Sequence, residues 1–458
     1  MLNNILLRNG LLYTIGGVLL QGVNFFTLPI FTRLLNVESF GIVSIYNTWL
    51  SILAIFICFQ SYGSIGNAKI NYTEEEFREY ILNIVLLSTV IFVLWILIFF
   101  IFQEKISQKI NISINLIYVM LLQSFFNTII VLKTTIYIYE QKVKEKLIVS
   151  FINIFFNVVF SILLIKYLYI QKTYIGRIIG GAVPTILLGL FYYIEILKRN
   201  LIKVKIKYWK FCLTLTIPLV FHGLSGIVLS SADRLMLEKF KGFYETGIYS
   251  FIYNFGMIIS MIWGALNSAW IPWYYENLKD KNEQKIKKYS INYLYIFTML
   301  SIGFLMISPE IIKMMAPSKY WKGLNFFPLI LLGNYFVFLY SFSVNYEFYC
   351  KKTKYIAIAT TSAAIINFLL NIYFIPRYGG IGAASTTLIA YFCMFLFHEM
   401  ITRLKLKYSI LKKSCYIKEI VKVCFFIIIY YLFLENLLLR VGLLILYVVI
   451  TIKKNIRI

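Results

Sequence analysis

The run ILNIVLLSTVIFVLWILIFFIF at residues 81–102 contains no charged side chain. The hydrocarbon core of a bilayer is about 30 Å thick, and a helix needs about 20 apolar residues to cross it, so this run predicts a transmembrane helix. Comparable runs alternate with short polar breaks along the whole chain, and 60% of its 458 residues are hydrophobic whereas 14% are charged. Soluble domains carry about a quarter charged residues. The sequence therefore predicts an all-α polytopic membrane protein.

Runs of similar length and composition predict about fourteen transmembrane helices. In chain order they cover residues 10–33, 41–67, 81–102, 116–139, 147–170, 175–197, 211–232, 247–271, 289–307, 326–349, 355–374, 381–401, 421–434 and 437–452. The last two are the shortest of the series. The longest outer breaks, residues 233–246 and 308–325, have only the size of loops.

The basic residues predict how the chain is oriented. About two thirds of the 45 lysines and arginines lie in every second break between the predicted helices. Positively charged segments are retained in the cytoplasm during insertion, so we expect both termini to face the cytoplasm. The formal net charge of +25 could also indicate a nucleic-acid partner, but these charges are spread over many short segments. We therefore expect contacts with membrane lipids and no nucleic acid.

Three short strings recur about 200 residues apart, at corresponding places in the predicted helices. GIVSIYN at residues 41–47 resembles GIYSFIYN at 247–254, the Arg-Leu pair at 33–34 matches that at 234–235, and IGGA at 179–182 resembles IGAA at 381–384. Such strings can be generic helix starts, but the shared spacing favours duplication of a six-helix unit. An even number of helices preserves orientation, so we expect two parallel lobes, residues 1–200 and 201–410. Residues 411–458 then add two helices.

The sequence holds few of the groups that catalytic and metal sites use. It has no glycine-rich phosphate loop with a following Lys and Ser or Thr, which argues against ATP-driven transport by this chain. Its two histidines and six cysteines lack the spacing of metal ligands. The outer breaks are too short for a hydrolase or glycosyltransferase domain. We therefore expect a transporter without a cofactor, and not an enzyme.

Paired amide side chains occur inside four of the predicted helices. The members of each pair are three or four residues apart and so share one helix face. One interpretation is that these amides hydrogen-bond between helices. The other is that they line a hydrated cavity and bind sugar hydroxyls, which need both donors and acceptors. The candidates are Gln21, Asn24, Gln123, Asn127, Asn153, Asn157, Asn367 and Asn371.

A smaller group of charged residues lies within the predicted helices or at their outer ends. Lys133 falls inside a helix, and Arg33, Arg177 and Arg234 lie at outer helix ends. They are candidates for binding phosphate or pyrophosphate through paired hydrogen bonds, although long basic side chains also reach the membrane surface as anchors.

Three further titratable residues complete this group. Asp233 and His222 are candidates for coupling transport to an ion or proton, although a histidine beside Pro218 also suits helix packing. The four-residue spacing of Glu347 and Lys351 favours a simple ion pair on one helix face.

Several motifs, taken in order, resemble a known family. LPIFTRLL at residues 28–35 followed by ESFG at 38–41, then DRL at 233–235 with GIYS at 247–250, then GGIGAA at 379–384 are similar to the polysaccharide-unit flippases of the Wzx type. These flippases share a superfamily with multidrug antiporters and the lipid II flippase. The resemblance covers about residues 5 to 400.

The resemblance implies both a structure and a function. The structure is a bundle of two lobes around a central cationic cavity in a bacterial cytoplasmic (inner) membrane. The function is to move an undecaprenyl-pyrophosphate-linked oligosaccharide to the outer leaflet by alternating access, with a polymerase and chain-length proteins as partners. We favour an O-antigen repeat unit for lipopolysaccharide, because the Ile-, Asn-, Lys- and Tyr-rich composition is typical of the AT-rich gene clusters that encode such systems.

Two other functions remain open. A polysaccharide polymerase of the same pathway is also polytopic, but such an enzyme usually carries a sizeable outer loop that this chain does not offer. A drug or cation antiporter of the same superfamily normally needs a carboxylate deep in one lobe, and none is obvious in the sequence.

Overall fold

The structure, a computed structural model, describes residues 16–17, 20, 22–23, 25–198 and 203–455. All regular elements in these ranges are helical. Nine of the described helices are long and apolar enough to cross a membrane, and two shorter apolar helices cover Phe25–Leu34 and Leu437–Thr451. The prediction of an all-α polytopic membrane protein is therefore confirmed.

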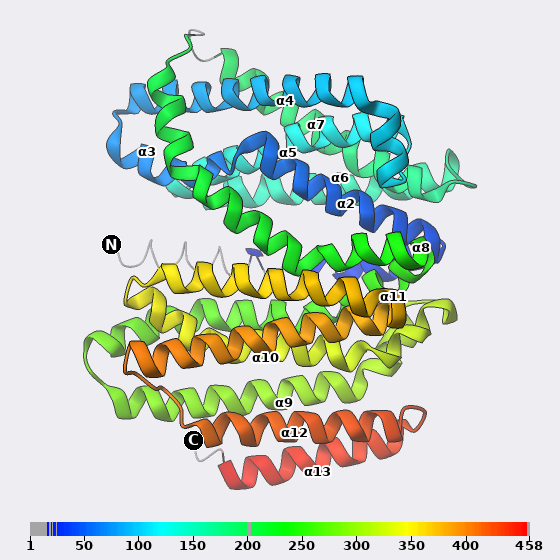
Figure 1. The fold of residues 1–458 in the computed structure, drawn as a ribbon, viewed down its shortest axis with the longest axis vertical. Coiled ribbons are helices and arrows are strands. Elements are labelled where there is room, and N and C mark those ends of the chain that lie inside the picture. The colour runs from blue at the N-terminus through cyan, green and yellow to red at the C-terminus, as the bar shows by residue number, and fades with distance from the viewer. Residues whose placement is uncertain (1–15, 18–19, 21, 24, 199–202, 456–458) are drawn as a thin grey trace. The chain divides into compact units, whose positions relative to one another are not determined.

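Contacts divide the chain into two compact units, which Figure 1 shows as two groups of helices. Unit 1 comprises residues 1–27 and 34–235. It contains α2 (Val37–Cys58), η1 (Ser61–Ser64), α3 (Ile65–Asn71), α4 (Glu74–Ile110), α5 (Ile114–Tyr139), α6 (Val143–Tyr167), α7 (Thr173–Lys198) and the first part of α8 (Ile206–Lys279). Within this unit α7 packs against both α6 and α5, and α5 also packs against α2.

Unit 2 comprises residues 28–33 and 236–458. It contains the rest of α8, α9 (Glu283–Met315), η2 (Ser318–Asn325), α10 (Phe327–Tyr349), α11 (Thr353–Met400), the short π-helix η3 (Ile401–Lys405), α12 (Lys413–Leu432) and α13 (Leu437–Asn455). The two C-terminal helices, α12 and α13, lie along α9 (Figure 1).

Two long helices each contain a pair of predicted spans. α8 covers the predicted runs 211–232 and 247–271, and α11 covers 355–374 and 381–401. Each helix is interrupted at a glycine between the two runs: Gly242 has φ 79° and ψ 177°, and Gly379 has φ 54° and ψ −130°. Glycine adopts these conformations at little cost because it has no Cβ. After the second break, the carboxylate of Glu245 accepts a hydrogen bond from the Gly380 amide at 3.2 Å.

The predicted run 41–67 is wrong at its C-terminal end. α2 stops at Cys58, because Phe59 and Gln60 adopt left-handed backbone conformations with φ 46° and 55°. A 3-10 turn and the separate helix α3 follow. At its start α2 is held by Asn36, whose side chain accepts a hydrogen bond from the Ser39 amide at 2.7 Å, as expected of an N-cap. The residues after Phe59 are mostly polar or small (QSYGSIGN at 60–67), so the predicted run was extended too far.

The boundary between the two units falls inside α8. The first part of α8 packs on the start of α4: the Trp209 indole donates to the Asn83 carbonyl at 2.9 Å, and the Tyr208 hydroxyl donates to Glu79 at 3.0 Å. These contacts place residues 203–235 with unit 1. The lobes 1–200 and 201–410, which rest on repeated strings and not on contacts, remain a prediction about how the chain arose.

Candidate functional site

Lys133 lies inside unit 1 and is bound to an acidic partner. Its ammonium nitrogen Nζ is 3.1 and 3.0 Å from the two carboxylate oxygens of Glu195, so α5 and α7 are joined by an ion pair. Only 12% of the Lys133 side chain is exposed. The rings of Tyr137 and Tyr192 lie with their centroids 5.2 and 5.3 Å from Nζ, within the range of cation–π attraction. A lysine so placed needs these partners, because an uncompensated charge among membrane helices is costly.

The Lys133–Glu195 pair forms part of the wall of a pocket of about 650 Å³. The starts of α4 and α6 and the ends of α5 and α7 surround this pocket, so it opens at one end of unit 1. Its charged residues include three basic and four acidic ones: Arg78, Lys133, Lys142, Glu74, Glu140, Glu145 and Glu195.

Most of these charges are compensated within the protein. Lys142 binds Glu140 at 2.7 Å, and Glu74 binds Lys69 at 2.5 Å outside the pocket. The pocket is therefore polar and nearly balanced in charge. To contact Lys133 or Lys142 strongly, an anion must displace the carboxylate that each of them binds.

Arg177 is held between α6 and α7. Its Nη1 donates to the Asn157 side-chain oxygen at 2.6 Å and to the Ser161 hydroxyl at 2.8 Å. The Asn157 amide in turn donates to the Gly181 carbonyl at 3.3 Å. Arg177 and Asn157, both candidates from the sequence, are thus brought together. In this structure they join two helices.

The remaining asparagine pairs make similar contacts. In unit 1 the Thr185 hydroxyl donates to Asn153 at 3.2 Å. In unit 2 Asn367 donates to the Thr387 hydroxyl at 3.3 Å, and Asn371 donates to Asn367 at 3.0 Å. Asn367 and Asn371 are fully buried. In each unit, two asparagines four residues apart therefore link the two halves of a helical hairpin. Substrate binding by these amides remains a prediction.

The other amide candidates are dispersed. Gln123 is buried and accepts a hydrogen bond from the Tyr46 hydroxyl at 2.8 Å, which joins α5 to α2. Asn127, one turn further along α5, is half-buried. Gln21 and Asn24 lie outside the described residues.

Arg33 contacts the end of a helix in unit 2. Its guanidinium donates to the Met314 carbonyl at 2.8 Å, and the neighbouring Thr32 hydroxyl donates to the Met315 carbonyl at 2.7 Å. These are the last residues of α9, whose terminal carbonyls lack partners within the helix. In this structure Arg33 therefore caps α9, as basic side chains often do at helix C-termini.

The three candidates in the first part of α8 do not form one cluster. Asp233 is buried and accepts a hydrogen bond from the Arg234 amide at 2.8 Å, and the Arg234 side chain is half-buried. His222, three turns earlier, is exposed on the surface of the protein. Ion coupling through Asp233 or His222 remains a prediction.

One pair of residues was not singled out as a site by the sequence. His398 Nδ1 on α11 lies 3.0 and 3.1 Å from the two carboxylate oxygens of Glu347 on α10, and both side chains are fully buried. The local spacing favoured Lys351 as the partner of Glu347, and this interpretation is wrong because α11 packs beside α10 and supplies the histidine. The scarcity of histidine was the only indication that the sequence offered.

Comparisons with known proteins place this geometry in a family. The model of the polysaccharide biosynthesis protein family matches residues 6–278. The Lsg locus putative protein 1 of Haemophilus influenzae is 23% identical over 399 residues, which cover 84% of this chain and 97% of that protein. An uncharacterized membrane protein of the same organism is 24% identical over 377 residues, which cover 79% of this chain and 88% of that protein.

Solved structures of two transporters share the fold. The lipid II flippase MurJ, in an inward closed conformation, has a TM-score of 0.73 at 18% identity, and the match covers 96% of this chain and 98% of MurJ. An inward-facing multidrug resistance MATE family transporter of the MOP superfamily has a TM-score of 0.66 at 13% identity, with 85% and 96% covered. Since the family model matches more than half of the chain, this multi-pass membrane protein belongs to the polysaccharide biosynthesis protein family and has the fold of MurJ and the MATE transporters.

Proposed function

We propose that this protein is a flippase for an undecaprenyl-pyrophosphate-linked oligosaccharide, most specifically an O-antigen repeat unit. It moves this lipid across the bacterial cytoplasmic membrane by alternating access, with both chain termini in the cytoplasm. Membership of a polysaccharide biosynthesis family and the fold of a lipid flippase support the proposal. A lipid-linked oligosaccharide needs a protein to cross the membrane, because its hydroxyl and phosphate groups would lose their hydrogen bonds to water in about 30 Å of hydrocarbon without gaining others.

The observation that carries the proposal is the Lys133–Glu195 pair in the wall of a polar pocket. Ionisable residues among membrane helices are rare and usually mark a substrate or ion pathway. In the proposed orientation, the pocket opens at the cytoplasmic end of unit 1, the side from which the lipid-linked oligosaccharide starts.

The pair suggests how a pyrophosphate is taken up. Without substrate, Glu195 neutralises Lys133. A phosphate group carries at least the same charge and offers more acceptor oxygens, so it can take the place of the carboxylate without leaving the lysine unpaired. The rings of Tyr137 and Tyr192 beside Nζ present apolar faces with polar edges, which suit the first sugar. Binding is then an exchange of one anion for another.

Deletion of the gene tests this function in cells. We expect the deletion strain to accumulate lipid-linked repeat units on the cytoplasmic side, and expression of the wild-type protein to restore surface polysaccharide. Lys133→Gln should reduce the restored polysaccharide at least ten-fold. Lys142→Gln is the matched control, since it removes a lysine of the same pocket whose side chain is about half exposed. Normal surface polysaccharide in the deletion strain, without a substitute flippase, would contradict the proposal.

A drug or cation antiporter is the second candidate, and one observation favours it. Glu347 is a fully buried carboxylate in unit 2, and the sequence had offered no obvious carboxylate of this kind. Loss of drug or cation resistance in the deletion strain, together with normal polysaccharide, would select this function.

A further inference from the structure

Unit 2 has a pocket of its own, which we call the α11–α12 pocket. It has a volume of about 500 Å³ and lies between the second half of α11, the π-helix η3 and the start of α12. Pockets of about 300–1,000 Å³ are the usual size for small ligands. Most of its lining side chains are apolar: Phe392, Leu396, Met400, Leu404, Ile417 and Ile420.

The packing of α12 leaves this pocket open. α12 packs along α9 and touches α10. Toward α11, the buried rings of Phe395 and Tyr416 meet with their centroids 5.4 Å apart and form the floor of the pocket. Phe392, Leu396 and Met400 are spaced by four residues, so they share one face of α11. Their side chains are 38%, 48% and 50% exposed, so the protein itself leaves this apolar face only partly covered.

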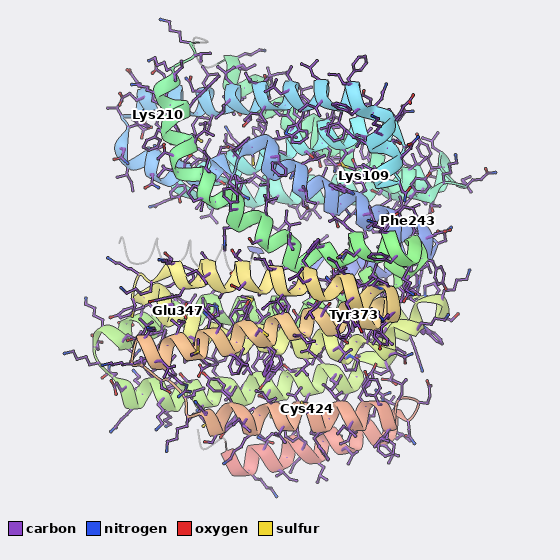
Figure 2. All side chains as sticks on the ribbon, in the orientation of Figure 1. Lys109, Lys210, Phe243, Glu347, Tyr373 and Cys424 are labelled. Carbon is purple, nitrogen blue, oxygen red and sulfur yellow. The ribbon has the colours of Figure 1, made fainter. Side chains whose placement is uncertain are left out.

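The pocket lies at the end of unit 2 that also contains Glu347. Figure 2 labels Glu347 there, at the opposite end of the unit from Tyr373. His398, which contacts Glu347, comes two residues before Met400 of the pocket wall, and η3 follows directly. Single π-turns of this kind occur frequently at functional sites. In the proposed orientation this end is cytoplasmic, so the pocket lies near the headgroups of the inner leaflet.

The charges around the pocket favour an anionic ligand. Residues 401–413 contain five lysines and arginines and no aspartate or glutamate. The one carboxylate in the pocket wall, Glu399, accepts hydrogen bonds from Arg403 at 2.7 Å and from the Ser343 hydroxyl at 2.8 Å. Arg403 also donates to the Leu411 carbonyl. Glu399 and Arg403 therefore neutralise each other, and this carboxylate does not repel an anion.

Lys413 is the basic residue of the pocket wall that is left for a ligand. Its side chain is exposed and has no acidic partner among the described residues. The ligand that suits such a wall has an apolar chain and one anionic group. Basic pockets between transmembrane helices on the cytoplasmic side are typical binding sites for anionic lipid headgroups. A lipid with a neutral headgroup would fill the pocket but leave Lys413 without a counter-charge.

We propose that the α11–α12 pocket binds a phospholipid with an anionic headgroup from the inner leaflet. One acyl chain lies against Phe392, Leu396 and Ile417, and the lipid phosphate pairs with Lys413. This lipid is a resident of the protein and not its cargo, because a long polyprenyl chain with a pyrophosphate would need more room and more than one available cation. The binding site does not depend on the proposed transport function; only its assignment to the inner leaflet rests on the proposed orientation.

Native mass spectrometry of the full-length protein tests the headgroup contact. Delipidated protein is titrated with phosphatidylglycerol, which is anionic, or with phosphatidylcholine, which has no net charge. We expect the wild type to prefer phosphatidylglycerol. Lys413→Gln should weaken that lipid about five-fold, which corresponds to about 1 kcal/mol per basic residue near a lipid headgroup, and should leave phosphatidylcholine unaffected. Lys418→Gln is the matched control, since Lys418 is an exposed lysine of α12 outside the pocket wall, and it should leave both affinities unchanged.

A bulky side chain tests the apolar part of the pocket. Leu396→Trp should fill the pocket and reduce the retention of both lipids, whatever their headgroup. Ile428→Trp is the matched control, because it places the same ring on α12 outside the pocket wall, and it should retain phosphatidylglycerol like the wild type. Leu396 and Ile428 are 48% and 58% exposed, so both variants should fold.

Several results would overturn the proposal. Equal affinity of the wild type for the two lipids, or equal weakening by Lys413→Gln and Lys418→Gln, would leave only a general attraction of lipids to a basic surface. Displacement of phosphatidylglycerol by undecaprenyl phosphate, lost in Leu396→Trp, would assign the pocket to the carrier lipid instead. A dimer that Leu396→Trp dissociates would assign it to a second copy of the chain. None of these measurements involves lipid movement, so their failure leaves the proposed flippase function untouched.

Discussion

Gly189 on α7 lies against the backbone of α5, and an added methyl group should force the two helices apart. A Cβ at this position would be 2.5 Å from the Phe126 carbonyl oxygen and 2.9 Å from its carbonyl carbon. Ordinary contacts begin near 3.4 Å, so Gly189→Ala must separate the helices by about 1 Å, and overpacking of this kind costs about 1–3 kcal/mol. The helix preference of alanine returns up to about 1 kcal/mol. We expect a net loss of about 1–2 kcal/mol in the free energy of unfolding.

The same separation should disturb the functional pair, because α5 and α7 also carry Lys133 and Glu195. Gly303→Ala on α9 is the matched control, since a Cβ there meets no atom within 4 Å. It should leave the free energy of unfolding unchanged or raise it by up to about 1 kcal/mol. Reversible unfolding titrations of both variants in one detergent give the comparison. If Gly189→Ala proved as stable as Gly303→Ala, the close approach of α7 to α5 would be wrong.

Three further changes concern stability. Arg440→Ala on α13 should lower the free energy of unfolding by about 3 kcal/mol, because it removes the ion-pair partner of the partly buried Glu310 on α9. Unfolding titrations should then show α12 and α13 unfolding before the other helices. Glu435→Gln should cost less than about 1 kcal/mol at neutral pH, since 78% of that side chain is exposed. The hydrogen bond from Lys313 lowers the pKa of Glu435 in the folded protein. The small stabilisation by this ion pair is therefore present at neutral pH and is lost as the pH falls and the Glu435 carboxylate becomes protonated. Asn371→Ala should lower the free energy of unfolding by about 1–3 kcal/mol, since it leaves the buried polar partners of Asn371 without a hydrogen bond. A melting temperature equal to that of the wild type would contradict this prediction.

The sequence predicted most of the helices because membrane thickness limits their length. The predicted run 116–139 and helix α5 (Ile114–Tyr139) end at the same residue, and the run 326–349 differs from α10 (Phe327–Tyr349) by one residue. The end of α2 was missed because the predicted run continued to residue 67, whereas the backbone is left-handed at Phe59 and Gln60 and mostly polar or small residues follow. Hydropathy thus predicts where helices can lie and not where the backbone turns.

The partners of the charged residues could not be predicted for a different reason. Lys133 and Glu195 are 62 residues apart in sequence, and Glu347 and His398 are 51 apart. Each pair forms because two helices pack side by side, and neither helix contains a pattern that specifies its neighbour. The sequence therefore indicated that Lys133 was unusual but not which carboxylate neutralises it.

Movement of a fluorescent, short-chain undecaprenyl-pyrophosphate-linked oligosaccharide across proteoliposomes that contain only this protein tests the central claim most directly. A membrane-impermeant reagent that quenches outer-leaflet label reports the movement. We predict that wild-type protein and Lys142→Gln move the lipid at similar rates, and that Lys133→Gln is at least ten-fold slower while it remains folded. Equal rates for vesicles with and without the wild-type protein would contradict the account.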